Sequence, residues 1–353
     1  MKGVVVTAYD APLALVELQP EPLLPGHARI EVLACGVCFS DVKIARGRMP
    51  FSARLALPHV PGHEIAGRVV ESDPPGAIPA GALVTVYNVW PCGLCDRCRA
   101  GDEHICRAPA VRAGFTEPGG LREEMIVPLD RLLVVPPGID PVHAAPLTCA
   151  LGTAYRAVVT RGEVRAGQRV AVIGLGGVGI HALQVAVAAG ARAVGVDRAA
   201  RTLEHAAGMG LDVIDAGSGE LDALLLDRTA GLGFDVVVDT VGHETTMADA
   251  IELVRPGGRV VAVGYAVGAP FVLPSPHLVL SEISVVGSRY GRRDDIEHAI
   301  RLVAEGRVEV VVDRVVAMEE AEAAFSALEA GEAVGRLVIG VNGHTSEEGS
   351  WNG

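Results

Sequence analysis

Apolar runs of strand length alternate with helix-length segments throughout the second half of the chain. From about residue 151, five such runs occur at residues 169–173, 193–196, 235–239, 259–263 and 283–286. Nearly continuous apolar strands are typical of sheets covered on both faces, and their alternation with helices is typical of parallel sheets. The pattern therefore predicts an α/β fold, with a doubly wound parallel sheet over residues 151–289.

The first 150 residues have a different texture. Eighteen of the 22 prolines lie there, between short β-branched runs such as 29–33, 66–70 and 83–86. Because proline and glycine separate strands by turns, this half is predicted to be an irregular, β-rich domain. After residue 290 the pattern predicts two amphipathic helices, at 294–305 and 318–330, and a strand at 336–341.

A glycine-rich turn follows the first predicted strand of the second half. The strand at 169–173 leads into Gly174-Leu175-Gly176-Gly177-Val178-Gly179, and a helical pattern follows. The first glycine permits a tight turn, the second allows close approach of a pyrophosphate, and the third allows the helix to pack on the strand. The phosphates then lie at the positive end of the helix. The residues assigned to this turn are Gly174, Gly176, Gly177, Val178 and Gly179.

Asp197 lies eighteen residues after Gly179, at the end of the next predicted strand. A carboxylate there accepts hydrogen bonds from the adenosine ribose and repels a 2′-phosphate. The sequence therefore predicts NAD as the cofactor. The neighbouring Arg198 leaves NADP open, because a guanidinium could contact the phosphate.

Four of the seven cysteines lie within fifteen residues, as Cys92-x-x-Cys95-x-x-Cys98-x7-Cys106. This spacing lets four thiolates reach one tetrahedral zinc ion and leaves no position for substrate, so the predicted role is structural. A pair of disulfides and an iron–sulfur cluster remain alternatives.

A second metal site is predicted from residues farther apart in the chain. Cys38 is followed 25 residues later by His63 in Gly62-His63-Glu64, and Cys149 is a further unassigned thiol. Two thiolates and an imidazole are the three protein ligands that leave a fourth position for water or substrate. A buried core histidine and a small buried cysteine are the alternatives for residues of these types.

These motifs, in this order and over nearly the whole length, resemble the zinc-dependent medium-chain alcohol dehydrogenases. The resemblance implies a GroES-like catalytic domain over residues 1–150, completed by residues 290–353, with a Rossmann dinucleotide-binding domain over 151–289. It also implies two zinc ions per subunit.

The resemblance assigns roles to individual residues. Cys38, His63 and Cys149 would bind the catalytic zinc, with Glu64 as an occasional ligand, and Asp41 would orient His63. Ser40 matches the hydroxyl that relays the alcohol proton. The matching cofactor contacts are Thr153 and Gly264 beside the nicotinamide and Arg336 at the pyrophosphate.

Two departures from the family pattern affect the expected chemistry. Lys43 occupies the position where many members carry a histidine beyond the relay hydroxyl. The sequence therefore does not predict the route by which the proton leaves after Ser40. Cys149, in place of a carboxylate, favours alcohol-type over sorbitol-type enzymes. Asn88, Trp90 and Phe51 are the candidate pocket residues, and their mixed character suits a functionalised or secondary alcohol.

The predicted function is NAD-linked interconversion of an alcohol and its ketone or aldehyde. A zinc-free double-bond or quinone reductase on the same fold is the alternative, and a non-enzymatic dinucleotide-binding protein is a third.

A net charge of −13 with no Lys/Arg run argues against nucleic-acid binding. The thiols favour the cytoplasm. No membrane span is expected, since the apolar stretch at 170–189 contains glycines, His181 and Gln184. No signal peptide is expected, since residues 1–7 contain one lysine and too short an apolar run. The family suggests a homodimer or homotetramer.

Overall fold

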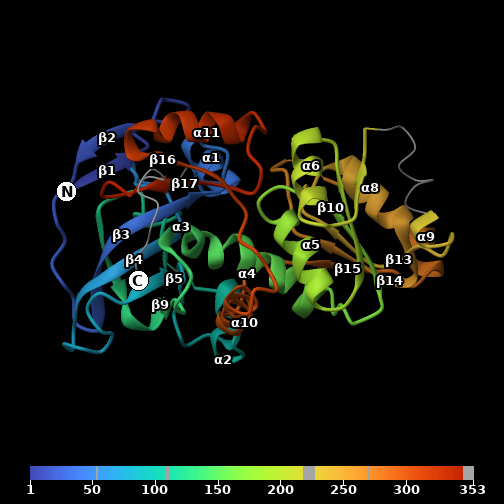
Figure 1. Cartoon of the computed structure of the whole chain (residues 1–353), viewed down its shortest axis with the longest axis horizontal. Helices are drawn as coiled ribbons and strands as arrows, with labels where there is room; N and C mark the ends of the chain where they lie inside the picture. Colours follow the sequence, from blue (N-terminus) through green and yellow to red (C-terminus); the bar gives the residue numbers. More distant parts are fainter. Residues whose placement is uncertain (53–54, 109–110, 218–226, 269, 345–353) are drawn as a thin grey trace. The chain divides into compact units, whose positions relative to one another are not determined.

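The computed structural model describes residues 1–52, 55–108, 111–217, 227–268 and 270–344. They form two compact units, each built on one large sheet (Figure 1). Unit 1 comprises Met1–Cys149, Arg292–Ala304 and the chain from Val312 onwards. Unit 2 comprises Ala150–Gly291 and Glu305–Val311.

Unit 2 contains a six-stranded parallel sheet in the order β12-β11-β10-β13-β14-β15. The first strand, β10, lies in the middle, and the chain winds outward from it in both directions, as in dinucleotide-binding domains. The predicted doubly wound sheet is therefore confirmed. Its strands are β10 (Arg169–Ile173), β11 (Arg192–Asp197), β12 (Val213–Asp215), β13 (Phe234–Asp239), β14 (Val254–Ala262) and β15 (Ser284–Gly287).

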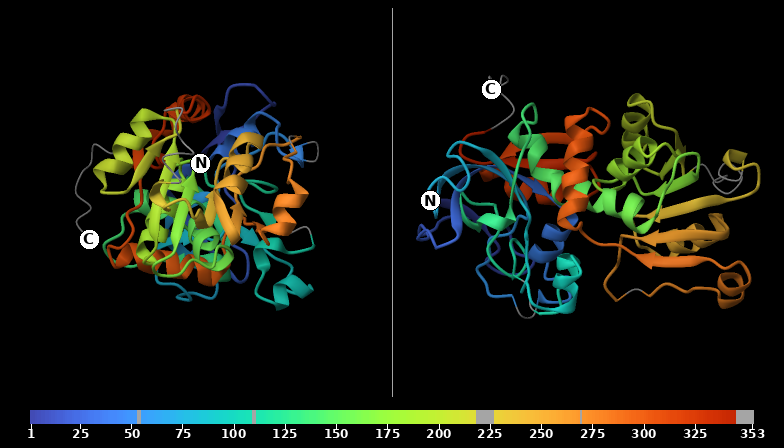
Figure 2. Two further views of the ribbon diagram at one scale, coloured as in Figure 1. Left: turned by 90° about the vertical axis from the view of Figure 1, so that its right-hand side faces the viewer. Right: turned by 90° about the horizontal axis from the view of Figure 1, so that it is seen from below.

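Helices cover both faces of this sheet, as Figure 2 shows. Right-handed crossovers place the helices of the two winding directions on opposite faces. This double cover explains why the strands are apolar without alternation: Val172, Val237 and Val260 are all fully buried. The helices of unit 2 are α4 (Ala150–Tyr155), a π-helical turn η5 (Arg156–Arg161), α5 (Gly179–Ala188), α6 (Ala200–Gly208), α8 (Glu244–Leu253) and α9 (Ser275–Leu280).

Unit 1 contains a seven-stranded, mostly antiparallel sheet with strand order β16-β17-β3-β4-β5-β9, and β8 also pairs with β3. Among the described strand pairs of this sheet, β16–β17 is parallel and the others are antiparallel. The C-terminal strand β17 pairs with β3, so the two ends of the sequence share one sheet. The strands are β3 (His27–Val37), β4 (Glu64–Ser72), β5 (Leu83–Val86), β8 (Glu124–Pro128), β9 (Leu132–Val134), β16 (Val312–Ala317) and β17 (Arg336–Gly340).

Smaller elements complete unit 1. Two short strand pairs lie outside the main sheet: β1 (Lys2–Val5) with β2 (Ala14–Glu17), and β6 (Val89–Trp90) with β7 (Val111–Arg112). The α-helices are α1 (Phe39–Ala45), α2 (Asp96–Arg99), α3 (Pro141–Ala144), α10 (Arg293–Ala304) and α11 (Ala321–Glu329). The 3₁₀ turns are η2 (Glu103–Ile105), η3 (Leu129–Arg131), η4 (Ala145–Leu147) and η6 (Met318–Glu320).

The hydrophobic pattern located most long elements within a few residues. It did not indicate the short strands β12 and β16, nor that Glu305–Val311 lies with unit 2. Within the described part of the chain, the helices are too short or too polar to span a bilayer.

Phe325 on α11 is 1% exposed and belongs to the same buried cluster as Val42 of α1 and Ile339 of β17. Phe325→Ala is expected to lower the free energy of unfolding by about 3–5 kcal/mol, because it leaves a cavity beside the helix that carries the candidate site. Urea denaturation measures this loss. Ser326→Ala, an exposed neighbour on α11, is the control and should stay within about 0.5 kcal/mol of wild type. A loss at Phe325 no larger than the control's would contradict this packing.

Candidate functional site

The first turn of α1 places a thiol and a carboxylate side by side. Cys38 is the N-cap residue, and its backbone N–H donates to the carboxylate of Asp41 at 2.9 Å. A carboxylate three residues after the N-cap commonly accepts this bond, since the first N–H groups of a helix lack partners within it. The local sequence Cys-Phe-Ser-Asp therefore holds the Asp41 carboxylate beside the backbone of Cys38.

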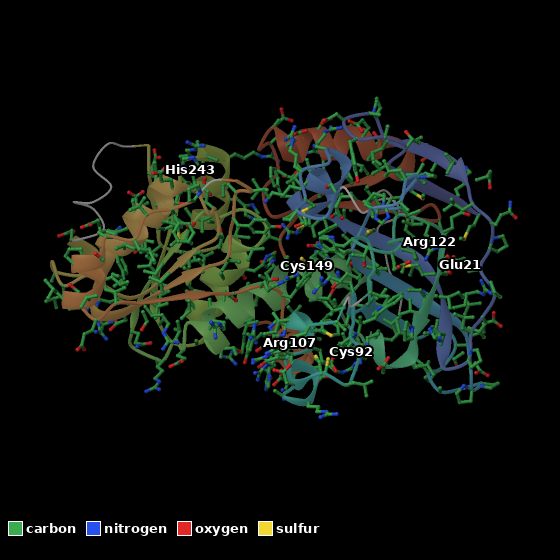
Figure 3. All side chains as sticks on the ribbon, turned by 180° about the vertical axis from the view of Figure 1, so that it is seen from behind. Glu21, Cys92, Arg107, Arg122, Cys149 and His243 are labelled. Atoms are coloured by element: carbon green, nitrogen blue, oxygen red, sulfur yellow. The ribbon has the colours of Figure 1, made fainter. Side chains whose placement is uncertain are left out.

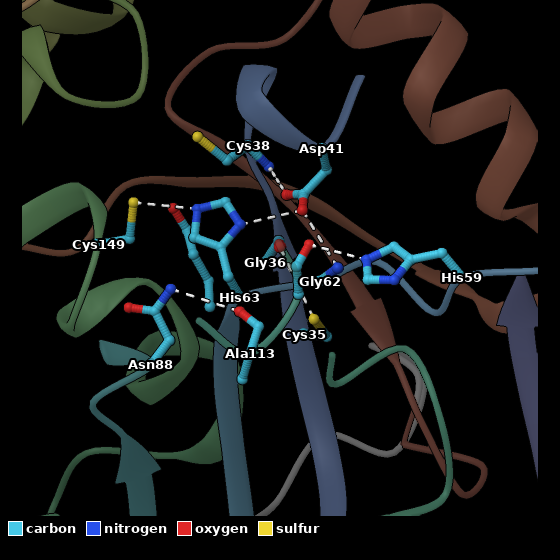
Figure 4. A network of polar contacts seen from close by, with 12 residues as sticks. Cys35, Gly36, Cys38, Asp41, His59, Gly62, His63, Asn88, Ala113 and Cys149 are labelled. Atoms are coloured by element: carbon cyan, nitrogen blue, oxygen red, sulfur yellow. Dashed lines mark hydrogen bonds and ion pairs between the residues drawn. The ribbon is translucent and has the colours of Figure 1, made fainter. Parts of the chain in front are cut away.

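Asp41 also organises the loop before β4. It is fully buried, and its Oδ1 accepts hydrogen bonds from the Gly62 backbone N–H at 3.1 Å and lies 3.0 Å from His63 Nδ1. With the proton on Nδ1, the Nε2 lone pair of His63 faces Cys149 Sγ, 3.3 Å away. Figure 4 shows this arrangement. The contact with Asp41 fixes the orientation of the ring, which is the role that the family resemblance implies for Asp41.

Four of the predicted ligands converge. Suitable donor atoms of Cys38, His63, Glu64 and Cys149 all lie within 4.8 Å of one another. His63, Glu64 and Cys149 are buried, and Cys38 is half-buried. Two sulfurs and an imidazole nitrogen form a donor set that suits zinc, so the residues present fit the predicted ion.

The titration of these groups reflects their crowding. A hydrogen bond from Cys149 holds the pKa of Cys38 well below its usual range, helped by the charges of Arg336 and His63, whereas the pKa of Cys149 is raised by the same pairing. Burial by itself lowers the pKa of His63, but Asp41 and Cys38 raise it well above its ordinary value. The pocket therefore favours one thiolate even before a cation is present.

Glu64 forms a buried ion pair with Arg336. Nε of Arg336 lies 3.0 and 3.1 Å from the two carboxylate oxygens, and Nη2 lies 3.7 Å from Cys38 Sγ. Burial raises the pKa of Glu64 to about 7, although the guanidinium opposes this shift. Arg336, predicted to contact the cofactor pyrophosphate, is thus 4% exposed and bound to Glu64.

An aromatic ring packs against His63. Its ring centroid lies 4.4 Å from that of Phe115, and Phe115 meets Phe51 edge-on at 6.3 Å. Asn88 is buried, with Nδ2 3.5 Å from the carbonyl of Ala113, and Trp90 is half-buried. The sequence did not single out Phe115, because nothing local distinguishes it from a core aromatic residue.

The two candidate proton carriers lie on α1. Ser40 is half-buried and stands two residues after Cys38, in the first turn. Lys43 lies farther along, with Nζ 5.6 Å from the centre of the Phe39 ring, and partial burial lowers its pKa. Ser40 is therefore tethered closer to the thiolate along the chain.

Four of the remaining five cysteines, Cys92, Cys95, Cys98 and Cys106, form a separate cluster around α2. Figure 3 labels Cys92 of this cluster and Cys149 of the first site. Their sulfur–sulfur distances are 3.5 Å for 92–106 and 95–98, 3.8 Å for 95–106 and 3.9 Å for 92–98. Four sulfurs at about 2.3 Å from one tetrahedral ion would lie about 3.8 Å apart. All seven cysteines of the chain are free thiols. The cluster therefore fits the predicted structural zinc and disagrees with the disulfide alternative.

Backbone donors and ion pairs support this cysteine cluster. The N–H groups of Arg107 and Cys98 lower the pKa of Cys95 to about 6, which favours the thiolate form. Asp102 pairs with Arg292 at 2.7 Å, which ties the cluster to the start of α10. Glu103 pairs with Arg131, also at 2.7 Å.

The glycine-rich turn has the geometry of a phosphate cradle. A Cβ on Gly179 would lie 1.7 Å from the carbonyl oxygen of Gly174, so only glycine fits where the helix meets the turn. Gly174 itself has φ +83°. A Cβ on the exposed Gly176 would meet nothing within 4 Å, which leaves room for a ligand there. These residues fit the predicted dinucleotide.

Asp197 lies at the end of β11 beside this turn. Its Oδ2 accepts from the N–H of Leu175 at 2.6 Å, and its Oδ1 accepts from the N–H groups of Arg198 and Ala199. Arg198 is exposed.

Two further predicted cofactor residues, Thr153 and Gly264, lie elsewhere in unit 2. Thr153 is buried in α4, and Gly264 follows β14, where a Cβ would lie 2.3 Å from the backbone of Val241. Sequence reasoning missed Thr240, whose hydroxyl lies 2.8 Å from the carbonyl oxygen of Gly174. Its position after a strand of the parallel sheet was the available signal.

Known proteins with similar sequences and folds agree with this architecture. Residues 177–305 match the zinc-binding dehydrogenase family, and residues 24–137 match the alcohol dehydrogenase GroES-like domain. An alcohol dehydrogenase of Geobacillus stearothermophilus is 32% identical over 341 residues, which are 96% of this chain and 98% of that protein.

Two solved structures are also similar over nearly the whole chain. An NAD-dependent alcohol dehydrogenase has a TM-score of 0.91 at 27% identity, covering 97% of this chain and 100% of the other. A zinc-binding dehydrogenase from Sinorhizobium meliloti, bound to NADP, has a TM-score of 0.86 at 27% identity, covering 96% and 98%. The GroES-like and Rossmann-type assignments are therefore confirmed. The chain belongs to the zinc-type, medium-chain alcohol dehydrogenase family, and it is an alcohol oxidoreductase linked to a nicotinamide dinucleotide.

Proposed function

We propose that the protein is a zinc-dependent, NAD(H)-linked dehydrogenase that interconverts a secondary or functionalised alcohol and its ketone or aldehyde. The observation that carries this proposal is the convergence of Cys38, His63 and Cys149, with Glu64 behind them, in one pocket of unit 1. Three such donors leave a fourth position on a tetrahedral ion for the substrate oxygen.

Zinc held there would act as a Lewis acid that polarises the substrate hydroxyl and makes its proton easier to remove. The chain's own residues do the rest. Ser40 relays the proton by accepting it at Oγ while its own hydroxyl proton passes on toward solvent. Asp41 holds the His63 ring in its binding orientation, and Arg336 keeps Glu64 paired. When bound, the dinucleotide would supply the nicotinamide that exchanges a hydride with the substrate carbon, and the glycine-rich turn and Asp197 would hold its pyrophosphate and adenosine part.

We propose NAD in preference to NADP, with Thr153 and Gly264 as contacts of the nicotinamide half and Arg336 as a pyrophosphate contact. The carboxylate of Asp197 supports the choice of NAD. The pocket candidates Asn88, Trp90 and Phe51 combine amide and aromatic groups, which supports a substrate with both polar and apolar parts.

The remaining proposals concern organisation. Unit 1 supports a catalytic domain of residues 1–150 and 290–353, and unit 2 supports a dinucleotide domain of residues 151–289. A homodimer or homotetramer is supported by the open edge of β15 and by the nearby exposed side chains of Val279 and Leu280, which are 68% and 84% exposed. Free thiols support a cytoplasmic location.

The proposed activity is tested by NADH absorbance with a panel of primary and secondary alcohols, before and after dialysis against a chelator. Turnover that disappears with the metal and returns with zinc would support the proposal. Reduction of quinones or activated double bonds by metal-free protein would instead establish the zinc-free alternative. Dinucleotide binding without turnover of either class would favour the non-enzymatic reading.

Two zinc ions per subunit are expected. Cys38→Ser should remove one ion and nearly all turnover while the fold persists. The ion bound by Cys38 is proposed to hold the substrate, and it is not needed to close a loop of the chain. Cys95→Ser should remove the other ion and mainly lower the thermal midpoint. Elemental analysis of wild type and both variants measures this, and a reproducible wild-type stoichiometry of one would refute the two-site proposal.

The efficiency with NAD is expected to exceed that with NADP by roughly ten- to a hundredfold, since one charge-assisted pairing with the ribose hydroxyls contributes about 1.5–3 kcal/mol. Asp197→Asn keeps the size of the side chain, removes its charge and should narrow the ratio. Steady-state kcat/KM with each cofactor gives the result. A wild-type preference for NADP would show that Arg198 controls the choice.

Ser40→Ala is expected to lower kcat by about a hundred- to ten-thousandfold, the usual contribution of a proton-transfer group. Ser40→Thr keeps the hydroxyl and should keep most of the rate. Lys43→Ala should cost far less, because Lys43 lies five residues after Cys38 with its ammonium over the Phe39 ring, whereas Ser40 lies only two residues after Cys38. Single-turnover rates of the three variants decide the order, and equal losses at Ser40 and Lys43 would overturn it.

A further inference from the structure

A seven-residue segment links the two units. Glu305–Val311 belongs to unit 2, although the residues on both sides of it belong to unit 1. It follows α10 and leads directly into β16. The peptide bonds 304–305 and 311–312 therefore join the two units. Contacts that hold the segment in place also constrain these two bonds.

Two buried side chains of α5 bind the backbone of this segment. Gln184 is 7% exposed and makes two hydrogen bonds with Glu309: its Nε2 donates to the carbonyl at 3.0 Å, and its Oε1 accepts from the N–H at 2.8 Å. His181 is fully buried, and its Nε2 accepts from the N–H of Val311 at 3.0 Å.

A third contact shows that the segment runs alongside the helix. The guanidinium of Arg307 donates to the carbonyl of Ala188, the last residue of α5, at 2.6 Å. The segment positions 307, 309 and 311 thus match helix positions 188, 184 and 181 in opposite order. Steps of two residues in an extended chain, about 6.6 Å, roughly match steps of three or four residues in a helix, about 4.5–6 Å. From Arg307 to Val311 the segment therefore runs antiparallel to α5.

The bond to Val311 determines the protonation of His181. Because Nε2 accepts a hydrogen, the neutral ring carries its proton on Nδ1, which donates to the carbonyl of Gly177 at 2.7 Å. Gly177 lies in the glycine-rich turn. One imidazole thus bridges the turn and the segment, and it lies in the first turn of the helix whose N-terminus faces the dinucleotide.

The far end of the segment leads to the metal pocket. Val312, the first residue of β16, is the register partner of Arg336, the first residue of β17. Arg336 binds Glu64 and lies near Cys38, as described above. A displacement of Val311 is therefore passed by one peptide bond to β16. This strand pairs with β17, which carries Arg336 of the candidate catalytic site.

We propose that His181 and Gln184 are positioning residues that couple occupancy of the dinucleotide turn to β16 and, through it, to Arg336. This inference rests on the dinucleotide site proposed above. Binding of a pyrophosphate at the turn orders the Gly177 carbonyl, and His181 transmits that order to the N–H of Val311. Gln184 holds the segment aligned on α5, so that a change at His181 reaches Val311 and is not absorbed by movement of the segment.

Hydrogen–deuterium exchange with and without ADP-ribose tests the coupling in the zinc-loaded full chain. ADP-ribose occupies the turn but lacks the nicotinamide, so it separates this route from direct contact at the metal pocket. In wild type, the ligand should slow exchange at residues 174–179 and also at 311–317, the latter about fivefold or more, as expected for a real coupling.

Two substitutions of His181 separate its two bonds. The amide of His181→Asn can occupy the place of Nδ1 and keep the bond to Gly177, whereas that of His181→Gln can occupy the place of Nε2 and keep the bond to Val311. His181→Asn should retain protection of 174–179 and lose that of 311–317. His181→Gln should keep the slow basal exchange of Val311 but likewise fail to transmit the effect of ADP-ribose.

Gln184→Leu provides an independent variant if substitutions of His181 prevent folding, and it should reduce the transmitted protection. Val187→Ala, on α5 but 47% exposed, is the matched control and should behave as wild type. Wild-type protection at the turn without protection at 311–317, or full transmission in both His181→Asn and Gln184→Leu, would overturn the coupling. No wild-type protection at the turn would instead overturn the dinucleotide site, and this inference with it.

Discussion

The carboxylate of Asp41 accepts hydrogen bonds from three parts of the chain at once: the N-cap amide of α1, the loop amide of Gly62 and the ring of His63. It is fully buried, so an unpaired charge there would be costly, and each of these donors offsets part of that cost. The same bonds place Cys38 and His63 at a fixed separation. The geometry of the candidate catalytic site therefore depends on how one buried charge is satisfied.

A second buried charge pair extends this arrangement to the C-terminal strand. Glu64 and Arg336 are 0% and 4% exposed, and burial of such a pair stabilises a fold little unless hydrogen bonds satisfy both partners. The contribution of this ion pair is to position elements of the chain. Arg336 begins β17, which pairs with β3 just before Cys38. The ion pair thus links the end of the sequence to the loop that carries His63, and this explains why unit 1 needs residues after 312.

Much of this architecture could be predicted because it rests on local requirements. The Gly174–Gly179 turn, the four clustered cysteines and the Cys38–Asp41 cap each depend on spacing within a few residues, which a sequence displays directly. The contact of Phe115 with His63 and the ion pair of Arg336 with Glu64 join distant residues of ordinary type. Strand β16 and the Glu305–Val311 segment were missed for a related reason, since side chains of α5 decide where the segment lies.

Asp197 shows how one residue can meet a local and a functional requirement together. Its two oxygens accept three backbone N–H groups, so the carboxylate is held at the end of β11 and cannot rotate away from an approaching ligand. A fixed negative charge discriminates against a phosphate more strongly than a mobile one, because avoiding the repulsion would break those bonds. One of the three donors, Leu175, lies inside the glycine-rich turn. The residue proposed to select the ribose therefore also shapes the turn proposed to hold the pyrophosphate, which would tie cofactor choice to the conformation of the turn.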